Sequence, residues 1–240
     1  MGEAKRRKKT GQPVAKGKPS QKPLIIALSA GVVALVIAIV YFITAPPAPT
    51  SDALPTASAN ASPFPAQLDE YGVSLGDPDA PVVVREFADY QCPACQSFAS
   101  ASQQLKEKYV KSGQVRFVYF DLPLRQHQNA VPAALAARCA GDQDRYWAMH
   151  DRLFDDQYEW SGSGSATDMF ERYAKDLGLE TRRFRRCMNT ELHLEAIEQS
   201  RQVAVQLQLT STPTVLVDNI RLTRPGWGQL SAVVERELAK

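Results

Sequence analysis

Two of the four cysteines in this 240-residue chain belong to one motif, Cys92-Pro93-Ala94-Cys95. The apolar run from Val82 to Phe87 just before the motif is too short for a core helix and predicts a buried strand. Apolar residues at helical spacing predict a helix over about 93–111. Proline is favoured in a first helical turn because its missing N–H needs no partner there. The sequence therefore places Cys92 at the N-terminus of a helix.

That position has a chemical consequence for Cys92. The first turn of a helix offers unpaired N–H groups and the positive end of the helix dipole, and both stabilise a thiolate. The thiolate is the reactive form of cysteine in thiol–disulfide exchange. Cys95 lies one turn further along the helix and can close a small disulfide with Cys92. The motif thus predicts a redox site with Cys92 as the accessible nucleophile and Cys95 as the buried resolving thiol.

A zinc site and a purely structural disulfide are the two other interpretations of the motif. Zinc sites of this kind usually have a second Cys-x-x-Cys or a pair of histidines. The other cysteines, Cys139 and Cys187, stand far apart and alone. A disulfide across two residues removes little loop entropy from the unfolded chain, so it would add little stability. The redox interpretation is favoured, and neither a metal nor an organic cofactor is expected.

The surroundings of the motif resemble the thioredoxin superfamily. A strand precedes the Cys-x-x-Cys helix, and Thr212-Pro213 stands directly before an apolar run at 214–217. Thioredoxin-like proteins place a cis-proline against the Cys-x-x-Cys motif, just ahead of a strand, and a Thr-Pro bond makes the cis form accessible. The resemblance implies that Thr212 and Pro213 lie beside Cys92 and bind substrate. The alternative is a trans proline that merely starts the strand.

The other expected elements fit an α/β thioredoxin fold interrupted by helices. A first strand is expected at 71–75, and the strand at 114–120 completes a parallel βαβ unit with a right-handed crossover. From about 122 to 209 the pattern is helical throughout, with an exposed loop at 162–164. The helices expected there are 127–140, 143–155, 167–177, 181–188 and 191–208. The chain is expected to close with strands at 214–217 and 220–222 and a helix at 229–238.

A thioredoxin fold with an inserted helical domain is the arrangement of DsbA-like oxidoreductases, and the resemblance runs from about residue 70 to the C-terminus. Glu86 occupies a position where these proteins often keep a buried acid near the active site; the alternative is an ordinary carboxylate at a strand end. The dipeptide Pro93-Ala94 departs from the Pro-His of strongly oxidising DsbA proteins. Because a histidine beside the thiolate is missing, we expect a lower reduction potential.

The N-terminal part of the chain predicts a membrane anchor. Residues 1–23 carry eight Lys and Arg and one acid, whereas the remaining residues carry a net charge of −5. Leu24 to Ile43 is a run of twenty residues without a charge, enough to span about 30 Å of hydrocarbon. A cleaved signal peptide is the alternative, but its apolar region is usually only about 7–15 residues long. The basic tail is therefore expected in the cytoplasm, and not on nucleic acid.

By the positive-inside rule, the residues after the anchor are expected outside the cytoplasm. Residues 44–66 contain six prolines among small residues and predict an extended spacer between the anchor and a folded domain at 67–240. Exported cysteines persist as disulfides and their total here is even, so Cys139 and Cys187 are expected to form a second, structural disulfide. Two buried free thiols are the alternative.

The histidines and a basic cluster complete the candidates. The three histidines are expected on separate helices: His127, His150 and His193. A cysteine–histidine hydrolase would need a histidine aligned with a cysteine, and no histidine here has motif spacing to a cysteine or a carboxylate. A dense basic cluster around Cys187 predicts a solvated helix face or a surface for an acidic partner. It consists of Arg182, Arg183, Arg185 and Arg186.

The sequence thus predicts a membrane-anchored, extracytoplasmic thiol–disulfide oxidoreductase that forms disulfides in exported proteins. The family resemblance implies a quinone-linked membrane partner of the DsbB or vitamin K epoxide reductase type, which would reoxidise the Cys92–Cys95 pair. Two alternatives stay open. One is a reductase or isomerase of the same fold, and the other is a non-catalytic binding module. The sequence reveals neither the substrates nor the oligomeric state.

Overall fold

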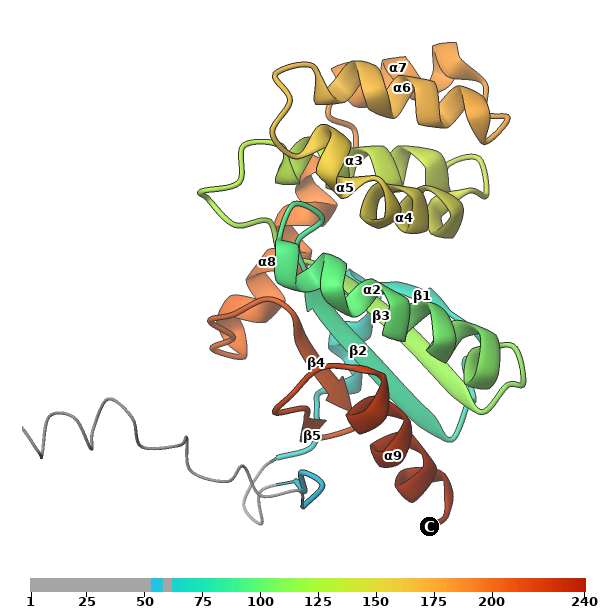
Figure 1. Cartoon of the computed structure of the whole chain (residues 1–240), viewed down its shortest axis with the longest axis vertical. Helices are drawn as coiled ribbons and strands as arrows, with labels where there is room; N and C mark the ends of the chain where they lie inside the picture. Colours follow the sequence, from blue (N-terminus) through green and yellow to red (C-terminus); the bar gives the residue numbers. More distant parts are fainter. Residues whose placement is uncertain (1–52, 58–61) are drawn as a thin grey trace, which may run out of the picture. The chain divides into compact units, whose positions relative to one another are not determined.

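The computed structural model describes residues 53–57 and 62–240. These residues form a five-stranded sheet with helices on both faces (Figure 1). The predicted cytoplasmic tail and the predicted anchor, residues 24–43, lie outside the described residues, as does most of the predicted spacer. Among the helices of the described residues, none has the length and apolar character that crossing a membrane requires.

The sheet has the strand order β1-β3-β2-β4-β5. β2 (Val82–Ala88) pairs in parallel with β3 (Val115–Asp121), as the βαβ prediction requires. On its other side β2 pairs antiparallel with β4 (Thr214–Val217). β1 (Val73–Leu75) and β5 (Ile220–Arg221) are short antiparallel edge strands. The central strand is thus the one that leads into the Cys-x-x-Cys motif.

Helices cover both faces of the sheet. α2 (Pro93–Leu105), which continues as the π-helix η2 (Lys106–Val110), packs together with α9 (Trp227–Leu238) on one face. α8 (Leu194–Gln206) and the 3₁₀ helix η1 (Ala66–Tyr71) cover the other face. The first strand is shorter than predicted, because η1 occupies the residues just before Gly72.

The two faces follow from the alternation of side chains along β2. Val84 belongs to the apolar cluster with α2 and α9, whereas Phe87 stacks on Phe120 in the cluster with α8, with ring centroids 4.3 Å apart. Glu86 is two residues from Val84 and therefore faces α2. The polar residue of this strand is thus directed to the side that carries the redox motif.

The helical insertion lies between β3 and α8, and Figure 1 shows its helices grouped together beside α2. Its helices are α3 (Ala130–Gly141), α4 (Tyr146–Asp155), α5 (Gln157–Trp160), α6 (Ala166–Asp176) and α7 (Thr181–Asn189). α3, α4 and α8 begin about three residues later than the sequence predicts, because turns precede them. The four-residue α5 was not predicted. A disulfide between Cys139 and Cys187 joins α3 to α7, with 5.8 Å between the Cα atoms, as expected.

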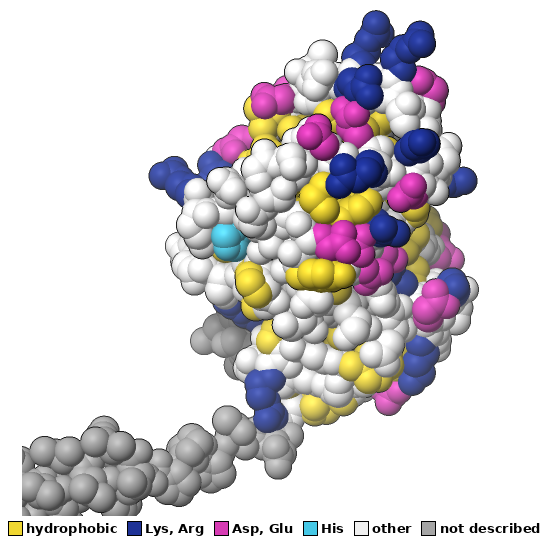
Figure 2. All heavy atoms as spheres, turned by 45° about the horizontal axis from the view of Figure 1, so that its top comes forward, with side chains coloured by type: hydrophobic (Ala, Val, Ile, Leu, Met, Phe, Trp, Pro, Cys, Tyr) yellow, Lys and Arg dark blue, Asp and Glu magenta, His cyan; other side chains and the backbone are white. Residues whose placement is uncertain are grey.

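Basic and acidic residues lie close to one another in the insertion. In Figure 2, basic side chains on the visible face are interspersed with acidic ones, except at the upper edge, where several basic side chains lie together. Within the basic cluster of α7, Arg185 pairs with Glu171 at 2.9 Å, and Arg183 donates to the main-chain oxygen of Asp142 at 2.6 Å. These contacts favour the interpretation of the cluster as a solvated helix face.

The folded body begins earlier than predicted. The guanidinium of Arg85 lies 4.0 Å from the ring centroid of Phe64, and Arg236 donates to the main-chain oxygen of Pro55 at 2.8 Å. Both Phe64 and Pro55 belong to the segment 44–66 that the sequence assigned to a spacer. The proline content hid these contacts, because composition does not show that one aromatic residue is held by a buried arginine.

Candidate active site

Cys92 starts the helix that follows the central strand. It is the N-cap residue of α2, and Pro93 is the first helical residue. The main-chain oxygen of Cys92 accepts hydrogen bonds from the N–H groups of Cys95 and Gln96, at 3.1 Å each. Both cysteines of the motif are free thiols in this structure. The helix start is therefore built on the residue that carries the reactive sulfur.

The two sulfurs differ in access and in acidity. Cys92 is only 8% exposed, so the predicted accessibility is limited to a small window, whereas Cys95 is 0% exposed. A hydrogen bond from the Cys95 thiol lowers the pKa of Cys92 to about 5, assisted by the N–H groups of Cys95 and Ala94 and opposed by burial. Burial and the same hydrogen bond raise the pKa of Cys95 far above its ordinary value. At neutral pH the pair therefore holds one thiolate and one thiol.

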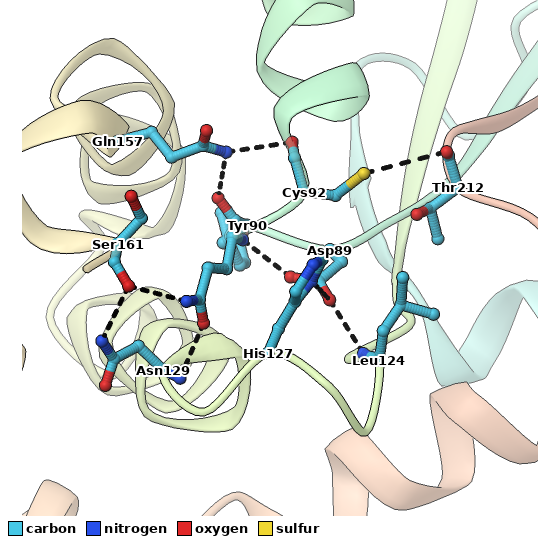
Figure 3. Close-up of polar contacts among 10 residues, drawn as sticks. Asp89, Tyr90, Cys92, Leu124, His127, Asn129, Gln157, Ser161 and Thr212 are labelled. Carbon is cyan, nitrogen blue, oxygen red and sulfur yellow. Dashed lines mark hydrogen bonds and ion pairs between the residues drawn. The ribbon is translucent and has the colours of Figure 1, made fainter.

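The predicted substrate-binding residues lie directly against Cys92. The main-chain oxygen of Thr212 is 3.9 Å from the sulfur of Cys92, across 120 positions of sequence (Figure 3). The bond between Thr212 and Pro213 is cis. Pro213 immediately precedes β4, which pairs with the central strand. Sheet pairing thus brings the Thr-Pro segment to the end of β2 where the redox motif begins.

Glu86 is a buried acid on the same side of the sheet. It is 1% exposed, and this burial raises the pKa of its carboxyl to about 8, although the charge of Lys106 acts in the opposite direction. Its charge in turn contributes to the raised pKa of Cys95. Lys106 is ion-paired with Asp151 of the helical insertion. The carboxyl therefore lies close enough to Cys95 to couple the protonation of the two groups.

Asp89 holds the loop between β2 and α2, and sequence reasoning missed it. Its buried carboxylate accepts hydrogen bonds from the N–H groups of Gln91 at 2.7 Å and Leu124 at 2.8 Å. The third contact is to Nδ1 of His127 at 2.8 Å (Figure 3). Burial raises the pKa of Asp89, and these hydrogen bonds oppose the shift. The segment 89–92, called the redox loop below, is thereby fixed to the loop after β3.

Contacts to the insertion hold the redox loop from another side. The side-chain amide of Gln157, on α5, donates to the main-chain oxygens of Tyr90 at 2.7 Å and Cys92 at 3.0 Å (Figure 3). Gln157 carries no signal in the sequence, because a glutamine at the start of a short helix is ordinary. Only the fold shows that it reaches the cysteine.

The histidine predictions need correction. His127 lies in the loop before α3 and His193 is the N-cap residue of α8, so neither lies within a helix. Each of the three histidines also contacts a carboxylate: His127 contacts Asp89, His150 contacts Asp151 at 2.9 Å, and His193 contacts Asp142 at 3.0 Å. Spacing along the chain gave no sign of these pairs, because two of them join separate elements.

His193 also lies near the second pair of cysteines. One of its ring nitrogens is within 4.8 Å of the sulfurs of Cys139 and Cys187. The two sulfurs are bonded to each other, so in this state they offer no thiolates to a metal.

The chain is similar to proteins of a known family. A family model described as thioredoxin matches residues 68–236. The chain belongs to the thioredoxin family. The probable disulfide bond formation protein D of Bacillus anthracis is 27% identical over 171 residues, which cover 70% of this chain and 78% of that protein.

Two solved structures of this family have the same fold. The crystal structure of oxidised BdbD from Bacillus subtilis matches with a TM-score of 0.64 and 23% identity, over 79% of this chain and 100% of that one. A thioredoxin-like oxidoreductase from Silicibacter pomeroyi DSS-3 matches with a TM-score of 0.59 and 30% identity, over 74% of this chain and 99% of that one. Together with the free thiols at the helix start, these relationships identify the chain as a DsbA-like thiol–disulfide oxidoreductase.

Proposed function

We propose that this protein is a membrane-anchored, extracytoplasmic oxidase that forms disulfides in exported proteins through Cys92 and Cys95. The position of Cys92 as the N-cap residue of α2, which goes with a pKa lowered to about 5, is the observation that carries the proposed chemistry. A dithiol whose thiolate is stabilised has a more stable reduced form, and the corresponding disulfide is a stronger oxidant. The name of the Bacillus relatives, disulfide bond formation protein, supports the same direction.

The reaction starts from the Cys92–Cys95 disulfide. A substrate thiolate attacks the sulfur of Cys92, which forms a mixed disulfide and releases Cys95 as a thiolate. A second substrate thiolate then attacks the substrate sulfur of the mixed disulfide and releases Cys92 as a thiolate. The substrate loses two electrons as its disulfide forms, and Cys92 and Cys95 gain them. Cys92 is a good leaving group because its thiolate is stabilised.

Cys95 takes up a proton after its release, because its raised pKa keeps it a thiol at neutral pH. We assign Glu86 a modulating role in this step. With a pKa of about 8, its buried carboxyl is mostly protonated at neutral pH and is available for proton exchange with the interior. The charge of an ionised Glu86 would instead raise the pKa of Cys95 further, so the two protonations are linked.

Thr212 and Pro213 are assigned to substrate binding. The main-chain oxygen of Thr212 lies 3.9 Å from the sulfur of Cys92, so an extended peptide beside it would present its own sulfur to that atom. Pro213 has no N–H of its own to offer. A Cys95→Ala variant, which cannot release the substrate internally, should trap a cysteine peptide on Cys92 with its backbone paired to Thr212.

The dipeptide between the cysteines tunes the strength of the oxidant. Pro93 supplies no N–H, and Ala94 supplies a main-chain N–H but no charged side chain to the thiolate. The pKa of about 5 lies between the values of about 7 for thioredoxin and about 3.5 for strongly oxidising DsbA. We therefore expect an intermediate reduction potential, between about −270 and about −120 mV.

The proposed location follows from the N-terminal sequence. The uncharged run from Leu24 to Ile43 and its basic flank support an anchor with the tail in the cytoplasm and the folded domain outside. A quinone-linked membrane protein of the DsbB or vitamin K epoxide reductase type would take two electrons from the reduced Cys92–Cys95 pair. The disulfide re-forms, the one proton held by Cys95 is released, and the second proton that the quinone needs comes from solvent. The anchor would keep the two proteins in the same membrane.

Refolding and reduction assays test this function. The oxidised protein should reactivate a reduced, disulfide-requiring enzyme while its own Cys92 and Cys95 become reduced in equal amount. It should be a poor catalyst of insulin reduction by a small dithiol. Rapid insulin reduction without reactivation would instead show a reductase, and the absence of both activities would show a binding module.

A further inference from the structure

Gln157 is the residue of the helical insertion that reaches the backbone of the reactive cysteine. It is 6% exposed, and its amide nitrogen uses both hydrogens on the redox loop, at Tyr90 and at Cys92 (Figure 3). Since Gln157 is 65 positions away from Cys92 in sequence, these bonds join two separately built parts of the fold.

A second set of contacts joins the same two parts. The side-chain amide of Gln91, in the redox loop, donates to the main-chain oxygen of Ser161 at 2.7 Å and accepts from the N–H of Asn129 at 2.7 Å. The side chain of Asn129 donates to Ser161 at 3.1 Å. Two glutamines therefore join the redox loop to the insertion: Gln157 from the insertion and Gln91 from the loop.

The position of the Gln157 bonds gives them chemical weight. The main-chain oxygen of Cys92 accepts from Gln157 and also from the N–H groups of Cys95 and Gln96, which begin α2. The N–H groups that stabilise the Cys92 thiolate, those of Cys95 and Ala94, belong to this same turn. A shift of the redox loop relative to α2 would move the sulfur away from these donors.

We propose that Gln157 is a positioning residue through which the helical insertion sets the thiolate character of Cys92. The inference rests on the proposed role of Cys92 as the reactive sulfur. Gln157 donates only to main-chain oxygens of the loop, so it acts through the placement of Cys92.

A purely structural role for Gln157 is separable from this one, because the insertion contains a matched glutamine. Gln143 donates to the main-chain oxygen of Glu180 at 3.4 Å and accepts from its N–H at 2.8 Å. It therefore also makes two hydrogen bonds to main-chain atoms. These lie inside the insertion and do not involve the redox loop.

The test is a titration of the Cys92 thiolate by its ultraviolet absorbance in the reduced full-length protein. Gln157→Leu should raise the midpoint by about one pH unit, a tenfold change in the ratio of thiol to thiolate. Gln143→Leu should leave the midpoint unchanged. Gln91→Ala, at a partly exposed position, should shift the midpoint in the same direction by less, and it decides the question if Gln157→Leu does not fold.

Two outcomes would overturn the inference: wild-type midpoints in both folded variants of the redox-loop contacts, or an equal shift in Gln143→Leu. A wild-type protein that already titrates at the ordinary thiol value would instead overturn the proposed function itself. The two failures are therefore distinguishable in one set of curves.

Discussion

The two pairs of cysteines in this protein lie at opposite ends of helices. Cys92 begins α2, where N–H groups and the helix dipole stabilise a negative charge. Cys139 and Cys187 lie in the last turns of α3 and α7, where the dipole disfavours a thiolate. The imidazole beside this second pair contacts the carboxylate of Asp142, which compensates any positive charge on it. The end of the helix thus separates a reactive pair from an inert one.

The separation along the chain adds to this difference. The bond between Cys139 and Cys187 closes a loop of 48 positions and ties two helices of the insertion, so it constrains the unfolded chain strongly. The Cys92–Cys95 bond closes a ring within one helical turn and constrains little. One disulfide therefore stabilises the fold and the other takes part in exchange. Mutation can remove either bond and leave the other in place.

The largest expected effect is on activity. Cys92→Ser should reduce thiol–disulfide exchange with a protein substrate to the uncatalysed background, because the thiolate with the lowered pKa is lost. The double variant Cys139→Ala/Cys187→Ala is the control and should keep its exchange rate at a temperature where it is folded. A large loss of exchange in the folded control would contradict the division of roles.

The next effect is on stability. Removal of the second disulfide in Cys139→Ala/Cys187→Ala should lower the free energy of unfolding by about 4 kcal/mol, since the bond closes a long loop. Denaturant unfolding of the oxidised wild type and the variant measures this difference. A loss below about 1 kcal/mol would show that the bond is not what holds α3 to α7.

Much of this contrast could be predicted from the sequence. The strand before Cys92, the helix after it and the pairing of Cys139 with Cys187 follow from local pattern and from the cysteine count. The contacts that set the reactivity could not be predicted. Asp89, Gln157 and Asn129 are ordinary polar residues in the sequence. Only the fold brings Gln157 and Asn129 to the redox loop and gives Asp89, within the loop, its partners after β3.

Glu86 should produce a smaller effect that depends on pH. Its pKa is raised by folding from 4.5 to about 8, so between these values the folded protein binds a proton that the unfolded chain has released. The free energy of unfolding of the wild type should therefore fall as the pH rises, by about 1.4 kcal/mol per pH unit from this group. Glu86→Gln lacks this loss and should gain about 2 kcal/mol relative to the wild type between about pH 5.5 and 7.

Oxidised protein is needed for the Glu86 measurement, because Cys92 titrates in the opposite sense when reduced. Its pKa is lowered by folding, so its contribution to stability is lost as the pH falls towards about 5. The exposed Glu70→Gln is a suitable control. Equal pH dependence in the wild type and Glu86→Gln would show that the carboxyl is not held protonated.

The smallest expected effect comes from the residue between the cysteines. Ala94→His adds an imidazole N–H donor, positively charged at acidic pH, beside the Cys92 thiolate. The pKa of Cys92 should fall by up to about one unit, equivalent to about 1.4 kcal/mol, and the reduction potential should rise by about 30 mV. Equilibration with glutathione buffers measures the shift. An unchanged or lower potential would show that backbone donors already saturate the thiolate.

The two cysteine pairs can be compared directly in one experiment. The protein is equilibrated in dithiol and glutathione buffers of graded potential, and each pair is quantified by differential alkylation and mass spectrometry. Cys92–Cys95 should be half-reduced between about −270 and about −120 mV, whereas Cys139–Cys187 should remain oxidised down to about −300 mV. A Cys92–Cys95 midpoint below about −270 mV, or reduction of Cys139–Cys187 first, would show that Cys92–Cys95 is not an oxidising pair or that Cys139–Cys187 is not the structural one.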